Sequence, residues 1–473
     1  MSLAVRIVSG AYRDSVALMQ LSAELLALPG VKRASLAMAT PANLALLAEA
    51  GLLERPLDAA PNDLVIALEG RALEAAFAHA LRALGERRER TAPAATSIPR
   101  SIAQAHAVAP NANLALISVP GEYAGAEARK ALRLGLNVMV FSNNVPLEDE
   151  AALKREAGER GLLLLGPDCG TAIVDGVPLG FANEVRRGRI GYIAASGTGL
   201  QEVTCLADRL GEGVSQAIGT GGRDLHEAVG GLATLEALKR LAADRDTGVI
   251  VLISKPPAAA VAERVLAAAA RTRKPVVACF LGTSTKRRYS VKTLEEAAHA
   301  AVALARKRKI AFPKFRPRAL PRVAAPRRYV RGLFSGGTLA HEAALILGKA
   351  GLVVDLGDAV FTRGRPHPMI DFRLRNERIA AEAADPQVAV LLFDVVLGRG
   401  AHPDPAAELV PALQAARKRR LALVASVCGT EADPQVRSRQ VKRLQQAGVL
   451  VAESNAQAAQ LAAAIAARAG GAR

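Results

Sequence analysis

Two short segments of this sequence, AASGTG at residues 194–199 and LFSGGT at residues 333–338, decide the fold class. Each follows an apolar run typical of a buried strand and precedes a run typical of a helix. Glycines let the backbone approach an anion, N–H groups of the first helical turn point toward it, and hydroxyl groups add donors. The pair therefore predicts two phosphate-binding loops whose helix N-termini face one shared anion. The predicted phosphate ligands are Ser196, Gly197, Thr198, Gly199, Ser335, Gly336, Gly337 and Thr338.

The alternative for both loops is an ordinary helix N-cap in a tight turn, which Ser and Gly also serve. Repetition of the same loop about 140 residues apart favours anion binding over that alternative.

The composition favours an α/β protein. Hydrophobic residues make up 51% of the 473-residue chain, and Trp is absent, which fits alternating helices and buried parallel strands. The length suffices for roughly three or four domains. We therefore predict several Rossmann-like and flavodoxin-like parallel-sheet domains in tandem.

Several classes of protein are disfavoured. Apolar runs are interrupted by charges before they reach membrane-spanning length, and the start of the chain lacks the pattern of a signal peptide, so we expect a cytoplasmic protein. The four cysteines are widely separated, which predicts neither disulfides nor a zinc site. The net charge of +18 comes with no aromatic or helical nucleic-acid motif, so we expect most arginines to be solvated and no nucleic acid or membrane to bind.

Strand and helix patterns divide the chain. We predict a small N-terminal α/β unit at 1–88, a linker at 89–112, a Rossmann-like domain at 113–187, a flavodoxin-like domain at 188–304, a linker rich in Pro and Arg at 305–329, and a second flavodoxin-like domain at 330–473. The flavodoxin-like domain at 188–304 is predicted to hold strands at 190–194, 248–253 and 275–280, with helices at 199–210, 225–241 and 258–271. The last domain repeats that plan, which indicates an internal duplication.

The order of motifs between residues 114 and 282 resembles the α subunit of succinyl-CoA ligases. The matching motifs include GPDC at 166–169, GRIG at 188–191, SGT at 196–198 and GTGG at 219–222. The last domain, with DLGD at 355–358, FTRGRPHP at 361–368 and GAHPDP at 400–405, resembles the FdrA branch of that superfamily. With the N-terminal unit included, the whole chain resembles an FdrA protein. The resemblance implies tandem domains arranged as in succinyl-CoA ligase.

Two departures from the ligases concern their phosphate carrier. Where the ligases place a phosphohistidine loop, residues 282–290 contain no histidine, and the next one is His299. Where they place a glutamate that orients that histidine, this chain has Ser254, Lys255 and Pro256. We identify no ATP-grasp segment either. The chain is therefore not expected to make a thioester from ATP by itself.

Other candidate residues surround the two loops. Arg363, Arg365 and His367 form a stiff basic segment suited to a carboxylate or an oxyanion, with a rigid surface loop as the alternative. His402 follows a buried strand and is a candidate general acid or base, or merely a loop hydrogen-bonding residue. A histidine at 341 lies one turn into the helix after the second loop, within reach of the same anion, although an exposed or capping role is commoner for such a residue. The acidic residues of the last domain match no metal motif, so no metal is predicted. The predicted CoA-like or substrate-binding residues are Val119, Pro120, Ser142, Asn143, Asn144, Gly221, Gly222 and Arg223.

Three functions remain open. By resemblance only, FdrA-like proteins are implied to belong to a multisubunit oxamate carbamoyltransferase of allantoin degradation, which converts oxalurate and phosphate to oxamate and carbamoyl phosphate. The alternatives are an acyl-CoA synthetase component that needs an ATP-grasp partner, and a non-catalytic phosphate-binding scaffold. The first predicts phosphate or carbamoyl phosphate as the ligand and the second predicts CoA. Both enzymatic hypotheses imply further protein subunits.

Overall fold

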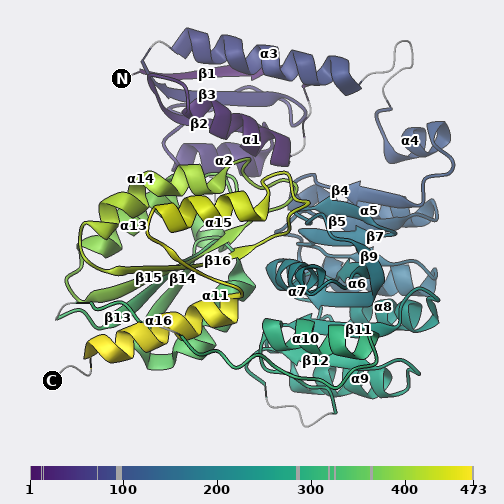
Figure 1. The fold of residues 1–473 in the computed structure, drawn as a ribbon. Coiled ribbons are helices and arrows are strands. Elements are labelled where there is room, and N and C mark those ends of the chain that lie inside the picture. The colour runs from purple at the N-terminus through teal and green to yellow at the C-terminus, as the bar shows by residue number, and fades with distance from the viewer. Residues whose placement is uncertain are drawn as a thin grey trace.

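The computed structural model describes residues 2–11, 13, 15–71, 73–91, 99–283, 288–317, 320–323, 326–362 and 366–470. Within these residues the chain forms four β-sheets, each with helices packed against it (Figure 1). No helix among them is long and apolar enough to cross a membrane.

The N-terminal unit is a small sheet with the order β1-β3-β2, in which both outer strands run antiparallel to β3. The prediction of parallel sheets therefore does not extend to this unit. β3 is buried along most of its length between the two partly exposed outer strands. Its elements are β1 (Ser2–Val8), α1 (Ser15–Leu26), β2 (Val31–Met38), α2 (Pro41–Glu49), β3 (Leu64–Gly70) and α3 (Leu73–Thr91).

The second unit is a parallel sheet with the order β4-β5-β6. Alanines on one face of α5 let this helix pack closely against α6 and the sheet. The elements are α4 (Ile102–Val108), β4 (Leu114–Ile117), α5 (Gly121–Arg133), β5 (Asn137–Val140), α6 (Leu147–Glu159) and β6 (Leu164–Leu165).

The third unit has the strand order β12-β11-β9-β10-β7-β8. Strands β9 to β12 are parallel, and the hairpin β7-β8 adds to the edge in the antiparallel sense. The elements are β7 (Thr171–Val174), β8 (Val177–Gly180), β9 (Arg187–Ala195), α7 (Gly197–Arg209), β10 (Val214–Gly219), α8 (Leu232–Ala243), β11 (Val249–Ser254), α9 (Ala259–Ala270), β12 (Val276–Phe280) and α10 (Leu294–Ala305).

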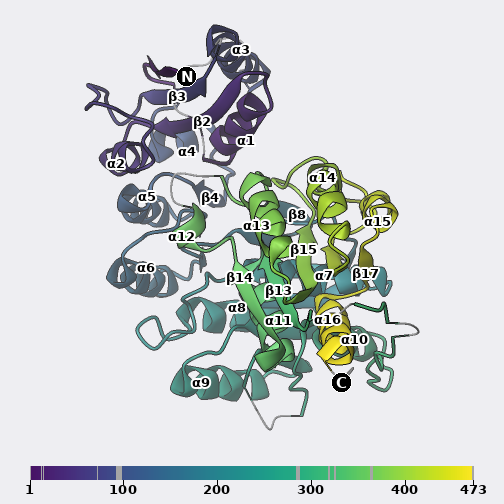
Figure 2. The same cartoon turned by 90° about the vertical axis from the view of Figure 1, so that its left-hand side faces the viewer.

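The fourth unit is a fully parallel sheet with the order β14-β13-β15-β16-β17, a flavodoxin-like arrangement. It faces the viewer in Figure 2, with the N-terminal unit above it. The elements are β13 (Tyr329–Phe334), α11 (Gly337–Leu347), η1 (Gly348–Ala350), β14 (Gly351–Asp355), α12 (Ala359–Thr362), α13 (Arg373–Ala384), β15 (Val388–Val396), α14 (Pro405–Arg417), β16 (Ala422–Cys428), α15 (Arg437–Gln446), β17 (Leu450–Ala452) and α16 (Asn455–Gly470).

The predicted α/β class with tandem parallel sheets is confirmed, but several elements were missed. The hairpin β7-β8 and the helices α10, α13 and α15 were not predicted, nor were β10, β14 and the short helices α4 and α12. The helix predicted at 225–241 begins later, at Leu232, because the Asp224 carboxylate accepts the N–H groups of Ala233 (3.2 Å) and Thr234 (2.9 Å). An internal carboxylate therefore fixes where α8 starts.

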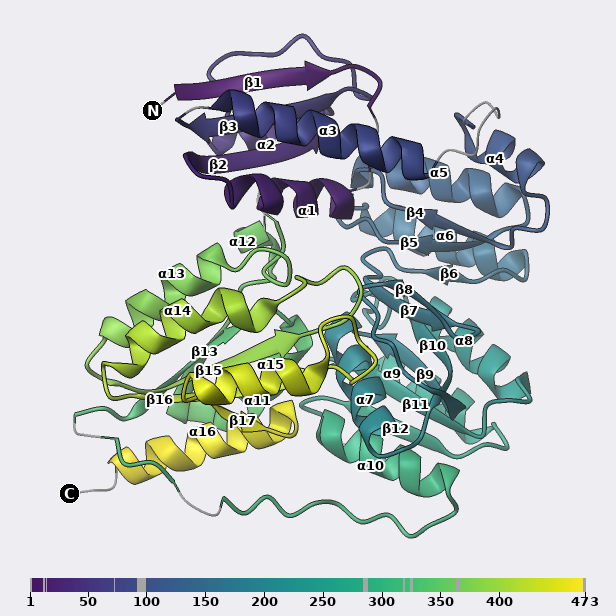
Figure 3. The same ribbon diagram turned by 45° about the horizontal axis from the view of Figure 1, so that its top comes forward.

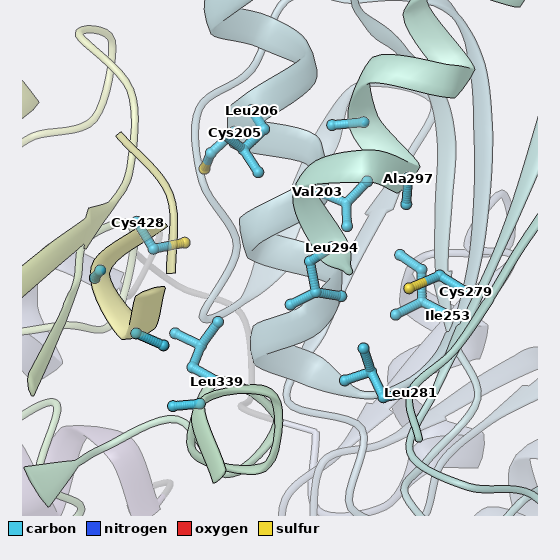
Figure 4. Packing of buried hydrophobic residues seen from close by; sticks show 14 of the residues in the cluster. Val203, Cys205, Leu206, Ile253, Cys279, Leu281, Leu294, Ala297, Leu339 and Cys428 are labelled. Atoms are coloured by element: carbon cyan, nitrogen blue, oxygen red, sulfur yellow. The ribbon is translucent and has the colours of Figure 1, made fainter. Parts of the chain in front are cut away.

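The third and fourth units share one hydrophobic core. Figure 4 shows Val203 and Cys205 of α7 packed with Leu294 of α10, Leu339 of α11 and Cys428 of β16. The two units also exchange helix caps, because buried carboxylates reach across the interface to N–H groups of the other unit. Glu202 of α7 accepts the N–H of Asn455 on α16 (3.0 Å), and Glu342 of α11 accepts the N–H of Leu294 on α10 (2.7 Å).

Candidate functional site

The structure brings the two predicted loops into contact. The hydroxyl groups of Ser196 and Thr338 lie 2.6 Å apart in a buried hydrogen bond, and the N–H of Thr338 points to Thr198 Oγ1 at 3.4 Å. A Cβ placed on Gly336 would lie only 2.9 Å from Thr198 Cγ2, so this approach of α7 and α11 requires glycine there. Two helix N-termini therefore meet at one place, while anion binding by them stays a prediction.

The first loop is open. Ser196 caps α7 through its hydroxyl, which accepts the N–H of Gly199 at 2.9 Å. Gly197 is exposed and Thr198 is partly exposed, and their N–H groups have no hydrogen-bond acceptor among the residues that the structure describes. These two donors at the positive end of α7 are available to a ligand.

The second loop is already occupied by a side chain of the chain itself. The Asp394 carboxylate accepts the Ser335 N–H (2.8 Å), the Ser335 hydroxyl (3.0 Å) and the Gly336 N–H (2.8 Å). Arg375 is fully buried and pairs with the same carboxylate at 2.8 Å, while its second nitrogen donates to the Asp394 carbonyl at 2.6 Å. The two loops therefore differ in what their N–H groups contact, while the shared anion stays a prediction.

Strand register explains this difference. Ser254 of β11 pairs with Ala195, the residue before Ser196. In the fourth unit Leu333 pairs with Phe393, which places Asp394 opposite Phe334, the residue before Ser335. Asp394 therefore occupies the position that Ser254 occupies in the third unit. Because the third unit has a serine at this position and the fourth unit has an aspartate, the second loop contacts an internal carboxylate and, among the described residues, the first loop does not.

Lys255 and Asp355 lie beside the N-terminus of α11. A Cβ placed on Gly337 would clash with Asp355 Oδ2 and would lie 3.3 Å from Lys255 Nζ. Lys255 is exposed and has no ion pair or hydrogen bond among the described residues. Burial raises the pKa of Asp355 to about 6, although the Gly357 N–H and the Lys255 charge oppose the rise. A lysine with no ion pair among the described residues therefore lies near a carboxyl group whose pKa is about 6.

His367 points toward the same region. Its Nδ1 accepts the Met369 N–H at 3.2 Å, so the neutral ring carries its proton on Nε2. A Cβ placed on Gly357 would lie 2.9 Å from this Nε2 and 3.1 Å from Asp355 Oδ1. Burial and the Arg375 charge lower the pKa of His367 to about 4, so the imidazole is neutral at pH 7 and offers an N–H donor. Arg363 and Arg365, predicted to act with His367, lie outside the described residues.

Comparison with known proteins establishes the family. Residues 333–465 match the CoA-ligase family model, and residues 1–99 match a family described as AllF, heavy metal-associated domain. The chain is 41% identical to the uncharacterized protein YahF of Escherichia coli K12, over 96% of this chain and 97% of YahF. The chain belongs to the YahF family.

More distant relatives place this YahF-family chain in the CoA-ligase superfamily, where it is similar to the α subunit of succinate–CoA ligases. It is 31% identical to the mitochondrial succinate–CoA ligase [ADP-forming] subunit alpha-2 of Trichomonas vaginalis, over 37% of this chain and 58% of that protein. Among solved structures, a dinucleotide forming acetyl-coenzyme A synthetase 1 of Ca. Korarchaeum cryptofilum is 17% identical, with a TM-score of 0.34 over 76% of this chain and 83% of that one.

The heavy-metal description does not fit the residues of the N-terminal unit. Residues 1–99 contain no cysteine and a single histidine, His79, whereas soft metals are bound by thiolate and imidazole groups. In the described part of the YahF-family chain no group of three or more His, Cys, Asp or Glu side chains is arranged to hold a metal ion.

The side chain of His402 contacts residues outside the two loops. Its Nδ1 accepts the Asp404 N–H at 3.1 Å, its Nε2 lies 4.0 Å from Glu408, and its ring meets Phe372 edge-on at 5.7 Å. These contacts support the alternative of a loop hydrogen-bonding residue at the start of α14.

The predicted CoA-like loops come together at the carboxyl ends of β4 and β5. The Ser142 hydroxyl donates to the Val119 carbonyl, and Pro120 is the N-cap of α5. A Cβ on Gly121 would clash with the backbone of Asn143 and Asn144, so the two loops pack backbone against backbone.

The predicted ligand Arg223 is engaged elsewhere in this conformation. Arg223 pairs with Glu150 at 2.8 Å and donates to the Val145 carbonyl at 2.8 Å. The buried Lys154 then bridges Glu150 and Asp224, at 2.8 Å each. The segment that carries Gly221 and Gly222 therefore ties the second unit to the third.

Sequence reasoning missed the roles of Asp394, Arg375 and Asp355 at this site, and it noted Lys255 only as a departure from the ligases. Asp394 interrupts the otherwise apolar, fully buried strand β15, and that interruption was a usable signal. Lys255 directly follows the buried strand β11, where ligand loops of parallel sheets begin. Arg375 gave no signal, because its helix α13 looks like a charged surface helix.

Proposed function

We propose that this chain is an FdrA-like subunit that transfers a carbamoyl group to inorganic phosphate, as in oxamate carbamoyltransferase. In this reaction oxalurate and phosphate give oxamate and carbamoyl phosphate. The observation that carries the proposal is the contact between the open N-terminus of α7 and the N-terminus of α11, beside which lie Asp355, the neutral His367 and Lys255, a cation with no ion pair among the described residues.

Phosphate is assigned to the α7 side of the site. The N–H groups of Gly197 and Thr198 supply donors at the positive helix end, and Lys255 supplies a full positive charge. Asp394 and Asp355 disfavour a second anion directly against α11. The site therefore suits one phosphate rather than a phosphate shared equally by both loops.

The remaining groups suit the transfer step. A phosphate oxygen forms a bond to the carbamoyl carbon, and the bond from that carbon to the oxamate nitrogen breaks. Protonated Asp355 gives its proton to the departing nitrogen, and the Nε2–H of His367 donates to the carbamoyl oxygen as negative charge develops on it. The route needs no phosphohistidine, in keeping with the absence of histidine at residues 282–290.

We further propose that the active assembly contains other subunits. Several relatives are named as subunits of succinate–CoA ligases, and this chain covers 58% of the length of one of them. No feature described above favours CoA over phosphate, so the ligase alternative enters only as an outcome of the test.

Lys255→Met is expected to weaken phosphate binding about tenfold, because it removes the positive charge that follows Ser254, the strand partner of Ala195 at the start of the open loop. Calorimetric titration of the full chain with phosphate, and then with carbamoyl phosphate, measures this. Lys349→Met is the matched control, because Lys349 is exposed on η1 and has no ion pair among the described residues. Binding of CoA without binding of phosphate, or equal phosphate affinity in both variants, would contradict the proposal.

A further inference from the structure

A cavity of about 310 Å³ lies between the N-terminal unit and the carboxyl ends of β4 and β5. Figure 3 shows α1 on the side of the N-terminal sheet that faces the rest of the molecule. Clefts at the carboxyl ends of parallel strands are where α/β proteins bind small molecules. The walls include Gln20, Leu116, Ser118, Phe141, Phe181 and Gly400.

Among the described residues that line the cavity, none carries a charged side chain. An ionic group placed there would lose hydration without gaining an opposite charge. The volume also suits a small molecule better than a nucleotide with its chain of phosphates. The described walls therefore favour a small neutral ligand over an ionic one.

One wall of the cavity is aromatic. The rings of Phe141 and Phe181 lie with centroids 5.9 Å apart and planes at 30°. A Cβ placed on Gly400, whose φ is +78°, would lie 3.0 Å from the Phe181 ring. Glycine at this position keeps the ring and its side of the cavity in place, and an aromatic ring face suits a planar group.

Two polar side chains give the cavity a hydrogen-bonding end. The Gln20 amide and the Ser118 hydroxyl have no hydrogen-bond partner in the described ranges of the chain. A glutamine amide presents an acceptor and donors side by side, which is the complement of an amide or ureido group.

We infer that this cavity binds a small, planar, neutral group with an amide or ureido function, and that α1 of the N-terminal unit closes it. The inference rests on the cavity and not on the phosphate chemistry proposed above, although the ureido end of oxalurate belongs to the same chemical class. Phe181 also packs against His367, with ring centroids 6.0 Å apart, so the cavity and the candidate anion site share one aromatic wall.

The test uses the full chain and hydantoin, a neutral planar ureide of about seven non-hydrogen atoms. We expect a Kd of about 1 mM, as is usual for a ligand of this size, measured by ligand-observed NMR titration. Gln20→Leu is expected to weaken binding about tenfold, because it removes the paired hydrogen bonds. Leu116→Trp, a change at an exposed strand position, is expected to abolish binding by filling the cavity. Gln414→Leu on the exposed face of α14 is the matched control and should change nothing.

The outcomes separate this inference from the proposed function. Phosphate affinity should be the same in all three variants, which also shows that each is folded. Hydantoin binding that is absent, or that is equal in the wild type, Gln20→Leu and Leu116→Trp, would overturn the inference. Displacement of hydantoin by CoA would overturn it too, because the cavity would then be part of a larger nucleotide site.

Discussion

Asp394→Ala is expected to lower the free energy of unfolding by about 3–5 kcal/mol. The change leaves the guanidinium of Arg375 fully buried without its partner at 2.8 Å, and it removes the acceptor of the Ser335 and Gly336 N–H groups. An unpaired buried charge costs far more than the pair contributes, because the desolvation of the remaining charge is no longer compensated. Urea unfolding followed by circular dichroism measures the loss.

Two further variants make this prediction specific. In Arg375→Met with Asp394→Ala, no charge remains unpaired, and much of the lost stability should return. Glu453→Ala removes two surface ion pairs, with Arg437 at 3.3 Å and with Arg209 at 3.6 Å. The Glu453 side chain is 74% exposed, so the change should cost at most about 1 kcal/mol. A single Asp394→Ala loss as small as that of Glu453→Ala would show that the buried pair does not hold the second loop.

The sequence predicted the parts of the molecule that follow from local pattern. Apolar runs and glycine-rich loops were enough to place β9 with α7 and β13 with α11, since period and turn chemistry are local properties. The hairpin β7-β8 was missed because its four-residue strands are too short to show a period. α8 was placed too early because its start depends on Asp224, a residue outside the helix.

The candidate site could be predicted only in part for a related reason. The two similar loops suggested that the third and fourth units bind an anion in equivalent ways. Whether they are equivalent depends on the residue that the neighbouring strand places beside each loop. Ser254 and Asp394 occupy matching positions in neighbouring strands, and they lie 58 and 59 residues after Ser196 and Ser335. That pairing is a property of sheet register and becomes visible only in the folded chain.

The third and fourth units are nevertheless held together by contacts within one chain, and this bears on how the site is assembled. Glu202 and Glu342 each cap a helix of the opposite half, and both carboxylates are buried. The N-termini of α7 and α11 are therefore held in contact by elements of a single chain. The open loop, Lys255 and Asp355 need no second copy of the chain to come together.

Asp355→Asn is expected to lower the rate of carbamoyl transfer by about a hundredfold or more, the usual effect of removing a general acid or base. The clearest measurement is the reverse reaction, carbamoyl phosphate with oxamate, in which ionised Asp355 accepts the proton of the attacking amide. Because its pKa is about 6, the carboxylate form grows as pH rises, so the reverse rate should increase between pH 5 and 7 and then level off. Asp355→Asn should remove this increase as well as lower the plateau.

Two neighbouring charges set the direction of further shifts in this pH profile. Asp358 raises the pKa of Asp355 and Lys255 lowers it, so Asp358→Asn should move the midpoint to lower pH and Lys255→Met should move it to higher pH. Asp358 is exposed, and its replacement should leave the plateau rate nearly unchanged, which makes it the matched control. A profile that keeps its midpoint in both variants, or an increase with pH that survives in Asp355→Asn, would assign the titrating group to another residue and would remove Asp355 from the proton transfer.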